Sequence, residues 1–83
     1  MKDQRYISVP EAARLLGITR QAAWALVRSG LLGAKLVPVR RRNRIFVYRQ
    51  SVVALLANPE YAKITRRRDR EEFAQNLAAK REG

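Results

Sequence analysis

The sequence contains neither cysteine nor histidine among its 83 residues, and this double absence removes several classes of chemistry. Without cysteine, the chain has no disulfides and no thiolate metal sites. Without histidine, it lacks the usual general base and the usual zinc ligand. A glycine-rich phosphate loop and a paired-carboxylate arrangement are also missing from the sequence. We therefore expect a protein that is not an enzyme, with no catalytic residues, no metal site and no cofactor.

Long apolar runs are absent as well, and acidic residues are few. No run approaches about 18 residues and residues 1–12 lack the apolar stretch of a signal peptide, so we expect a cytoplasmic protein without a membrane partner. Seven acidic residues stand against 18 basic ones, giving a net charge of +11. Residues 1–57 carry +9 of this charge and residues 58–83 carry +2. By charge alone, a compact basic surface of this kind favours a polyanion: DNA, RNA or an anionic membrane.

The segment from Ser8 to Gly30 predicts two short helices joined by a tight turn. Ser8 and Glu11 have the spacing of a capping box, in which each side chain accepts a hydrogen bond from the other residue's backbone N–H. Gly17 ends the first helix because glycine tolerates a left-handed backbone. Thr19 then caps the second helix, and Gly30 ends it.

The second helix separates a polar arc from an apolar side. At helical spacing, Arg20, Gln21, Trp24 and Arg28 fall within an arc about 100° wide. Arginine can bind guanine O6 and N7, and glutamine can bind adenine N6 and N7. This arc, together with Thr19, is therefore a candidate DNA-reading surface. The alternative is an ordinary solvated helix face, although burying Trp24 would draw the flanking arginines inward.

Two β-prone runs follow, residues 35–39 and 45–48, and they predict a hairpin around a basic link. We expect the link to form the hairpin tip, with Asn43 supplying turn chemistry and Pro38 on an outward edge. Basic residues at such a tip would bind phosphates or enter a minor groove. These candidate wing residues are Lys35, Arg40, Arg41, Arg42, Asn43 and Arg44. The alternative is a solvated charged loop, but clustered like charges repel one another and a polyanion would relieve that repulsion.

Apolar patterns indicate which segments close the core. Residues 50–57 predict a third helix, which ends before Asn58 and Pro59, where Asn58 can cap a new helical start. Alternation within residues 45–48 leaves two possibilities open, because either the odd-numbered or the even-numbered residues face the core.

The remaining segment is helix-prone and mixed in charge. We expect a break near Thr65 and then a helix over residues 66–82. Its apolar strip includes Phe73 and Leu77, which are too few to stabilise an isolated helix. The strip therefore docks on its own domain, docks on a neighbouring copy through these two residues, or frays. Residues 66–68 are three arginines that would add contacts to a nucleic-acid backbone.

Three segments resemble the excisionase-like group of MerR-type winged helix-turn-helix DNA-binding proteins. They are residues 6–13 (YISVPEAA), 15–22 (LLGITRQA) and 44–52 (RIFVYRQSV). The resemblance implies a mainly α fold with a small β-hairpin, in which the second helix enters a major groove and the hairpin an adjacent minor groove. The expected organisation is a winged helix-turn-helix domain over residues 1–57 and a C-terminal helical tail over residues 58–83.

The resemblance also implies a function without catalysis. An excisionase, or recombination directionality factor, of a phage or plasmid binds tandem attachment-site DNA cooperatively in a bacterial cell, bends it and directs an integrase toward excision. Its partners would be double-stranded DNA, further copies of itself and an integrase. The alternative is a small MerR-like transcriptional regulator that binds an operator as a dimer. A third possibility, a structural partner or RNA-binding module, lacks evident aromatic stacking platforms. The tail lacks sustained heptads, which argues against an effector-sensing activator.

Overall fold

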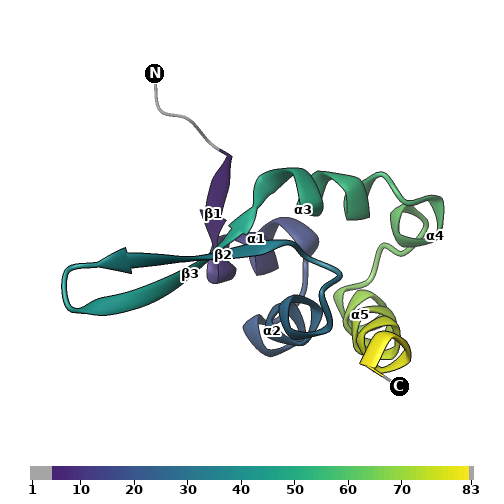
Figure 1. Cartoon of the computed structure of the whole chain (residues 1–83). Helices are drawn as coiled ribbons and strands as arrows, with labels where there is room; N and C mark the ends of the chain where they lie inside the picture. Colours follow the sequence, from purple (N-terminus) through teal and green to yellow (C-terminus); the bar gives the residue numbers. More distant parts are fainter. Residues whose placement is uncertain (1–4, 83) are drawn as a thin grey trace.

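The computed structural model describes the backbone of residues 5–82 and the side chains of residues 5–80. The elements are β1 (Tyr6–Ser8), α1 (Val9–Leu16), α2 (Arg20–Ser29), β2 (Ala34–Val39), β3 (Arg42–Tyr48), α3 (Arg49–Leu56), α4 (Pro59–Ala62) and α5 (Arg67–Glu82). Figure 1 shows the β2–β3 hairpin projecting away from the helices, with α2 beneath its base and α5 beside α2. This arrangement is the predicted winged helix-turn-helix with a C-terminal helix. The outermost residues of the two predicted ranges, 1–4 and 83, lie outside the described residues.

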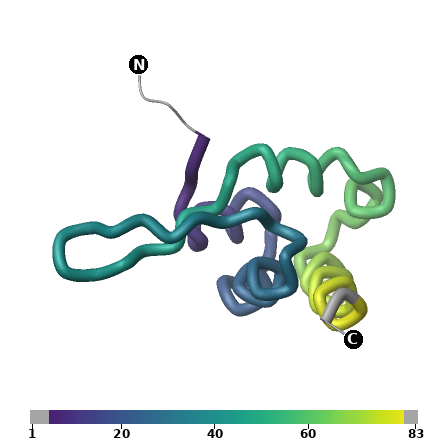
Figure 2. Tube along the Cα trace, viewed as in Figure 1, coloured from purple at the N-terminus to yellow at the C-terminus, as the bar shows by residue number. Residues whose placement is uncertain are grey.

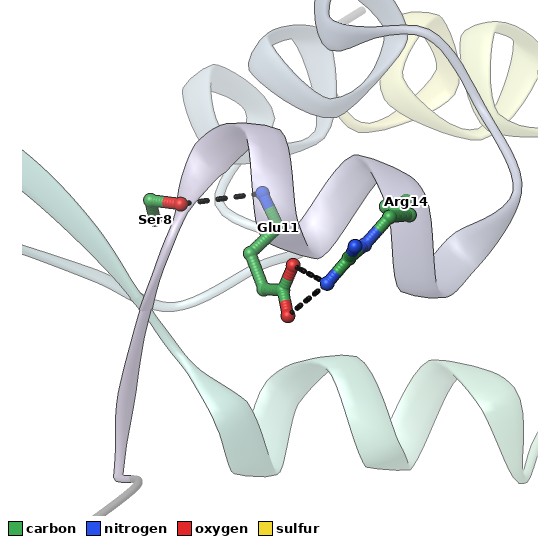
Figure 3. Close-up of polar contacts among 3 residues, drawn as sticks. All are labelled: Ser8, Glu11 and Arg14. Carbon is green, nitrogen blue, oxygen red and sulfur yellow. Dashed lines mark hydrogen bonds and ion pairs between the residues drawn. The ribbon is translucent and has the colours of Figure 1, made fainter.

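Helix α1 begins with half of the predicted capping box. The Ser8 Oγ accepts a hydrogen bond from the Glu11 backbone N–H at 3.3 Å, as Figure 3 shows. The reciprocal half of the prediction is wrong. The Glu11 carboxylate accepts instead from the Arg14 guanidinium, with 2.7 Å between Nη2 and Oε1. The nearby cation one turn along the helix draws the carboxylate away from the cap.

The turn between α1 and α2 follows the predicted signals. Gly17 ends α1 with a φ of 72°, and Gly30 ends α2 with a φ of 86°, both in the left-handed region. Thr19 caps α2 by accepting a hydrogen bond from the Ala22 N–H at 3.3 Å. Ile18, between the two helices, is buried. Local sequence signals therefore determine where both helices begin and end.

Three antiparallel strands form one sheet in the order β1–β3–β2. Strand β1 was not predicted, because three residues are too few to show an alternating pattern. Strand β2 lies at the edge of the sheet with Pro38 exposed, which confirms its expected position. Val47 is fully buried and Ile45 packs against the core, so the odd-numbered residues of β3 face inward.

The tip of the hairpin differs from the prediction. Arg40 and Arg41 form the turn, whereas Asn43 lies within β3 and pairs with Pro38. Arg40 has a φ of 57°, a left-handed conformation that two-residue hairpin turns require at their first central position. The prediction that Asn43 supplies the turn chemistry is therefore wrong, and an arginine occupies the position usually given to glycine or asparagine.

The C-terminal segment packs on its own domain. Asn58 caps α4 through a 2.9 Å hydrogen bond from the Glu60 N–H, and the chain breaks before α5 near Thr65, as predicted. Helix α5 lies against α2 (Figure 2), with Ala74 and Ala78 buried. Of the three possibilities left open for the apolar strip, docking on the same chain is the one observed.

Polar contacts attach this segment to the helix-turn-helix. Tyr61 is fully buried, and its hydroxyl donates to the Leu16 carbonyl at the end of α1. The Arg70 guanidinium donates to the same carbonyl at 3.3 Å and to the Ile64 carbonyl at 2.7 Å. Burial raises the pKa of the Tyr61 hydroxyl, and the positive charge of Arg70 partly opposes that rise. These contacts fix α5 behind the turn that joins α1 and α2.

Candidate nucleic-acid interface

The polar arc of α2 is exposed, as predicted. We call these four residues the recognition face: Arg20, Gln21, Trp24 and Arg28. The opposite side of the helix is buried in the core through Ala22, Ala23, Ala25 and Leu26. Small alanines let α2 approach its neighbours closely while the long polar side chains point away from the core. The fold therefore presents two guanidinium groups, one amide and one indole along a single helix face.

Thr19 stabilises the start of α2, next to the recognition face. Its hydroxyl oxygen accepts from the Ala22 N–H, and the hydroxyl donates to the Glu71 carboxylate at 2.7 Å. The cap is therefore confirmed, and α5 supplies the acceptor that orients it. A direct contact between Thr19 and DNA stays a prediction, because its hydroxyl proton is directed toward Glu71.

The hairpin brings its four arginines together, although not all of them at the tip. Arg40 and Arg41 form the turn, while Arg42 and Arg44 lie on β3. The placement of Arg42, Asn43 and Arg44 at the tip was therefore wrong, because β3 begins at Arg42, three residues before the β-prone run of residues 45–48. Together with Val39, the four arginines line one shallow hollow at the end of the hairpin.

The two faces of the hairpin carry different wing residues. Successive residues of a strand point to opposite faces, so Asn43 shares the face of Val47, which turns toward the helices. Arg42 and Arg44 lie on the other face. Lys35 pairs with Phe46 near the hairpin base, and its Nζ lies 5.5 Å from the centre of the Tyr6 ring. Lys35 therefore contacts an aromatic ring in the sheet and does not join the arginines at the tip.

A hollow separates the recognition face from the hairpin. Trp24, which is 36% exposed, lines it together with Leu36 and Asn43. Leu36 is 57% exposed, the largest exposure among the large apolar side chains of the described residues. The remaining lining residues are Ser8, Val9, Pro10, Arg44, Ile45 and Phe46. This apolar floor between two basic surfaces can contact thymine methyl groups or sugars.

Among the described residues, the arginines of these surfaces have no side-chain partners. Between residues 5 and 80, no side chain forms an ion pair or hydrogen bond with the guanidinium groups of Arg20, Arg28, Arg40, Arg41, Arg42 or Arg44. Their charges are therefore not neutralised by ion pairs within the described part of the chain. A duplex would supply the missing anions through its phosphates.

A second basic hollow lies at the turn of the helix-turn-helix. Its charged lining consists of four guanidinium groups from three helices: Arg14 of α1, Arg20 of α2, and Arg67 and Arg70 of α5. Thr19 and Thr65 also line it. The sequence offered no signal that Arg67 and Arg70 of α5 would line one hollow with Arg14 and Arg20, because that arrangement depends on how α5 docks.

Other kinds of site are not indicated in the described part of the chain. Across residues 5–80, no group of three or more acidic, cysteine or histidine side chains is arranged to hold a metal ion. None of the described helices has the length and apolar character needed to span a bilayer.

Comparison with known proteins gives one family. The model of the helix-turn-helix domain family matches residues 6–59, which is more than half of the chain. This range begins at β1 and ends at the first residue of α4, so it includes the recognition face and the hairpin. No curated protein and no solved structure matches the chain.

Proposed function

This chain belongs to the helix-turn-helix domain family and is a sequence-specific DNA-binding protein, and we propose that within this family it acts as an excisionase. In this role, several copies occupy tandem sites beside an attachment site and bend the DNA. The bent complex then directs an integrase toward excision. The integrase performs the strand cutting, so the chain itself supplies only binding and geometry.

The docking of α5 on its own domain carries this proposal. The chain departs from the transcription activators among MerR-type proteins, which use a long helix to pair with a second copy. Here Ala74 and Ala78 are buried against the same chain, so this side of α5 is occupied internally. A monomeric reading unit suits tandem direct repeats, on which each copy occupies one site. A pre-formed two-fold dimer would instead suit an inverted repeat.

Neighbouring copies on direct repeats would touch through two different surfaces. Such a heterologous contact repeats along the DNA without closing into a ring. Phe73 packs edge-on against Tyr61 of its own chain, with 5.8 Å between ring centres, so it is largely committed internally. Leu77, one turn further along α5 and half-buried, is the stronger candidate for contact with a second copy.

Site selection followed by footprinting tests this proposal. Duplexes that bind the full chain would be enriched from a random pool, and the protected positions on longer DNA would then be mapped. We expect direct repeats, cooperative filling and a bend detected by circular-permutation electrophoresis. We also expect Leu77→Ala to reduce cooperativity while leaving affinity for one isolated site unchanged.

The alternative regulator makes different predictions in the same experiments. A single protected inverted repeat, filled by a dimer without a bend, would contradict the excisionase proposal and favour a small transcriptional regulator. An integrase assay gives a second readout, because adding the chain should raise the yield of excised product from attachment DNA. An unchanged yield in the presence of a cognate integrase would also count against the proposal.

A further inference from the structure

We propose that the basic hollow at the helix-turn-helix turn binds a backbone phosphate of the same duplex, with Arg67 of the C-terminal helix as a direct contact. This inference rests on DNA binding through the recognition face. It extends the interface to a helix that lies outside the matched family segment, residues 6–59. The contact would add affinity without adding sequence preference, because a phosphate is present at every step of a duplex.

The charge of the hollow is the first support. Arg14, Arg20, Arg67 and Arg70 line it, and no acidic side chain does. Four guanidinium groups around one concave surface repel each other unless an anion lies between them. A phosphate matches this site because its oxygens accept paired N–H donors from the planar guanidinium fork.

The availability of the donors is the second support. Arg20 and Arg67 are exposed, and neither side chain forms a hydrogen bond or ion pair with another residue in the described part of the chain. Arg14 is paired with Glu11, and Arg70 donates to two backbone carbonyls. Arg20 and Arg67 therefore supply the free donors, whereas Arg14 and Arg70 contribute mainly positive charge.

The position of Arg67 follows from the way α5 is anchored. Arg70 binds the end of α1 and lies 5.3 Å from the centre of the Tyr61 ring. Gly17 leaves room for this arrangement, because a Cβ there would lie 2.8 Å from Arg70 Nη1. Arg67 precedes Arg70 by three residues, so the two side chains lie on the same side of α5. The contact that holds α5 in place thus also directs Arg67 into the hollow.

The hollow is continuous with the recognition face. Arg20 belongs to both, since it begins the exposed arc of α2 and also lines the hollow. When a recognition helix enters a major groove, the phosphates bordering that groove pass close to its first residues. Two carboxylates lie near the hollow without lining it. Glu11 is paired with Arg14, and Glu71 accepts the Thr19 hydroxyl and lines a neighbouring hollow.

Affinity measurements on the full chain test the inference. Arg67→Ala would be compared with wild type on a selected duplex and on a scrambled duplex over a series of salt concentrations. We expect affinity for both duplexes to fall by about fivefold at moderate salt, and the slope of log K against log salt to decrease by about 0.9. Of the three arginines at residues 66–68 that were expected to contact the backbone, only Arg67 lines the hollow. Arg68→Ala is therefore the matched control, because it removes the same charge from the adjacent position and leaves the lining of the hollow intact. We expect it to change affinity less than twofold.

Duplexes carrying single methylphosphonates identify the phosphate itself. Wild type should lose affinity when one particular flanking phosphate is neutralised, and Arg67→Ala should be insensitive to the same change. Equal losses for Arg67→Ala and Arg68→Ala, or unchanged sensitivity to that methylphosphonate, would overturn this inference and leave DNA binding through α2 intact. Failure of wild type to prefer any duplex would overturn the proposed function and this inference with it.

Discussion

Replacing Gly17 with alanine tests whether the turn of the helix-turn-helix is shaped by the C-terminal helix. Gly17 has a φ of 72°, a conformation that side chains disfavour. An added Cβ would also lie 2.8 Å from Arg70 Nη1, so the guanidinium would have to move. That movement would break the 3.3 Å hydrogen bond from Nη1 to the Leu16 carbonyl. The substitution therefore perturbs both the backbone and the anchor of α5.

The magnitude combines three terms. A left-handed backbone costs about 1–2 kcal/mol for a residue with a side chain. The lost hydrogen bond adds about 1 kcal/mol, and the lower chain entropy of the unfolded alanine variant returns about 0.4–1 kcal/mol. The expected net loss is about 2 kcal/mol, which lowers the melting temperature by about 8–16 °C in a domain of this size.

Thermal and urea unfolding followed by circular dichroism would measure this loss. Gly30→Ala is the control for the backbone term, because Gly30 ends α2 with a φ of 86°. A double-mutant cycle with Arg70→Ala isolates the second term, and we expect a coupling of about 1 kcal/mol between Gly17 and Arg70. The reasoning is refuted if Gly17→Ala costs the same with and without Arg70, or no more than Gly30→Ala.

Four further outcomes are expected. Gln21→Ala should reduce the preference for one base pair by about 1–3 kcal/mol, measured by competition between duplexes that differ at single positions. An equal loss of affinity for all sequences would contradict the proposed contact between Gln21 and a base. Arg41→Ala should weaken binding to every sequence and lower the salt slope by about 0.9, and an unchanged slope would exclude a phosphate contact. The free energy of unfolding should fall as pH rises above 10.0, the ordinary pKa of tyrosine. Burial raises the pKa of the Tyr61 hydroxyl in the folded protein, so the unfolded chain loses the hydroxyl proton at a lower pH than the folded chain does. Urea titrations across alkaline pH would measure this fall in stability, and the fall should be smaller in Tyr61→Phe. An equal fall in wild type and Tyr61→Phe would show that other groups cause it. Trp24 is the single tryptophan, so its emission should change when a selected duplex is added, and unchanged emission at saturation would place DNA away from the hollow beside it.

The helix-turn-helix could be predicted because its signals act over a few residues. Thr19 caps the helix that follows it immediately, and Gly17 and Gly30 each end a helix through their own backbone conformation. The exposed arc of α2 follows from helical spacing alone, once the alanine side is assigned to the core. These features require no knowledge of distant contacts, so all of them could be predicted from the sequence.

The hairpin tip and the docking of α5 depend on distant contacts. Burial of Val47 favours one register for β3, and that register places Arg40 in the turn even though Asn43 has the better turn chemistry. The position of α5 depends on pairs such as Thr19 and Glu71, which are 52 residues apart. Neither residue type indicates such a partner from local sequence. The basic hollow at the helix-turn-helix turn forms only when α5 docks beside α1 and α2. It could therefore not be predicted from the sequence.

The buried alanines of α2 and α5 have a consequence for altering what this protein reads. The four outward residues of α2 can be exchanged one at a time, because they are exposed and the buried core does not include them. Transplanting the complete helix from another reader is a different matter, since any bulkier residue at Ala22 or Ala23 would push against the core that α5 helps to cover. New target sequences should therefore evolve through substitutions on the exposed face of α2. The buried side of α2 and the α5 residues packed against it should change together or not at all.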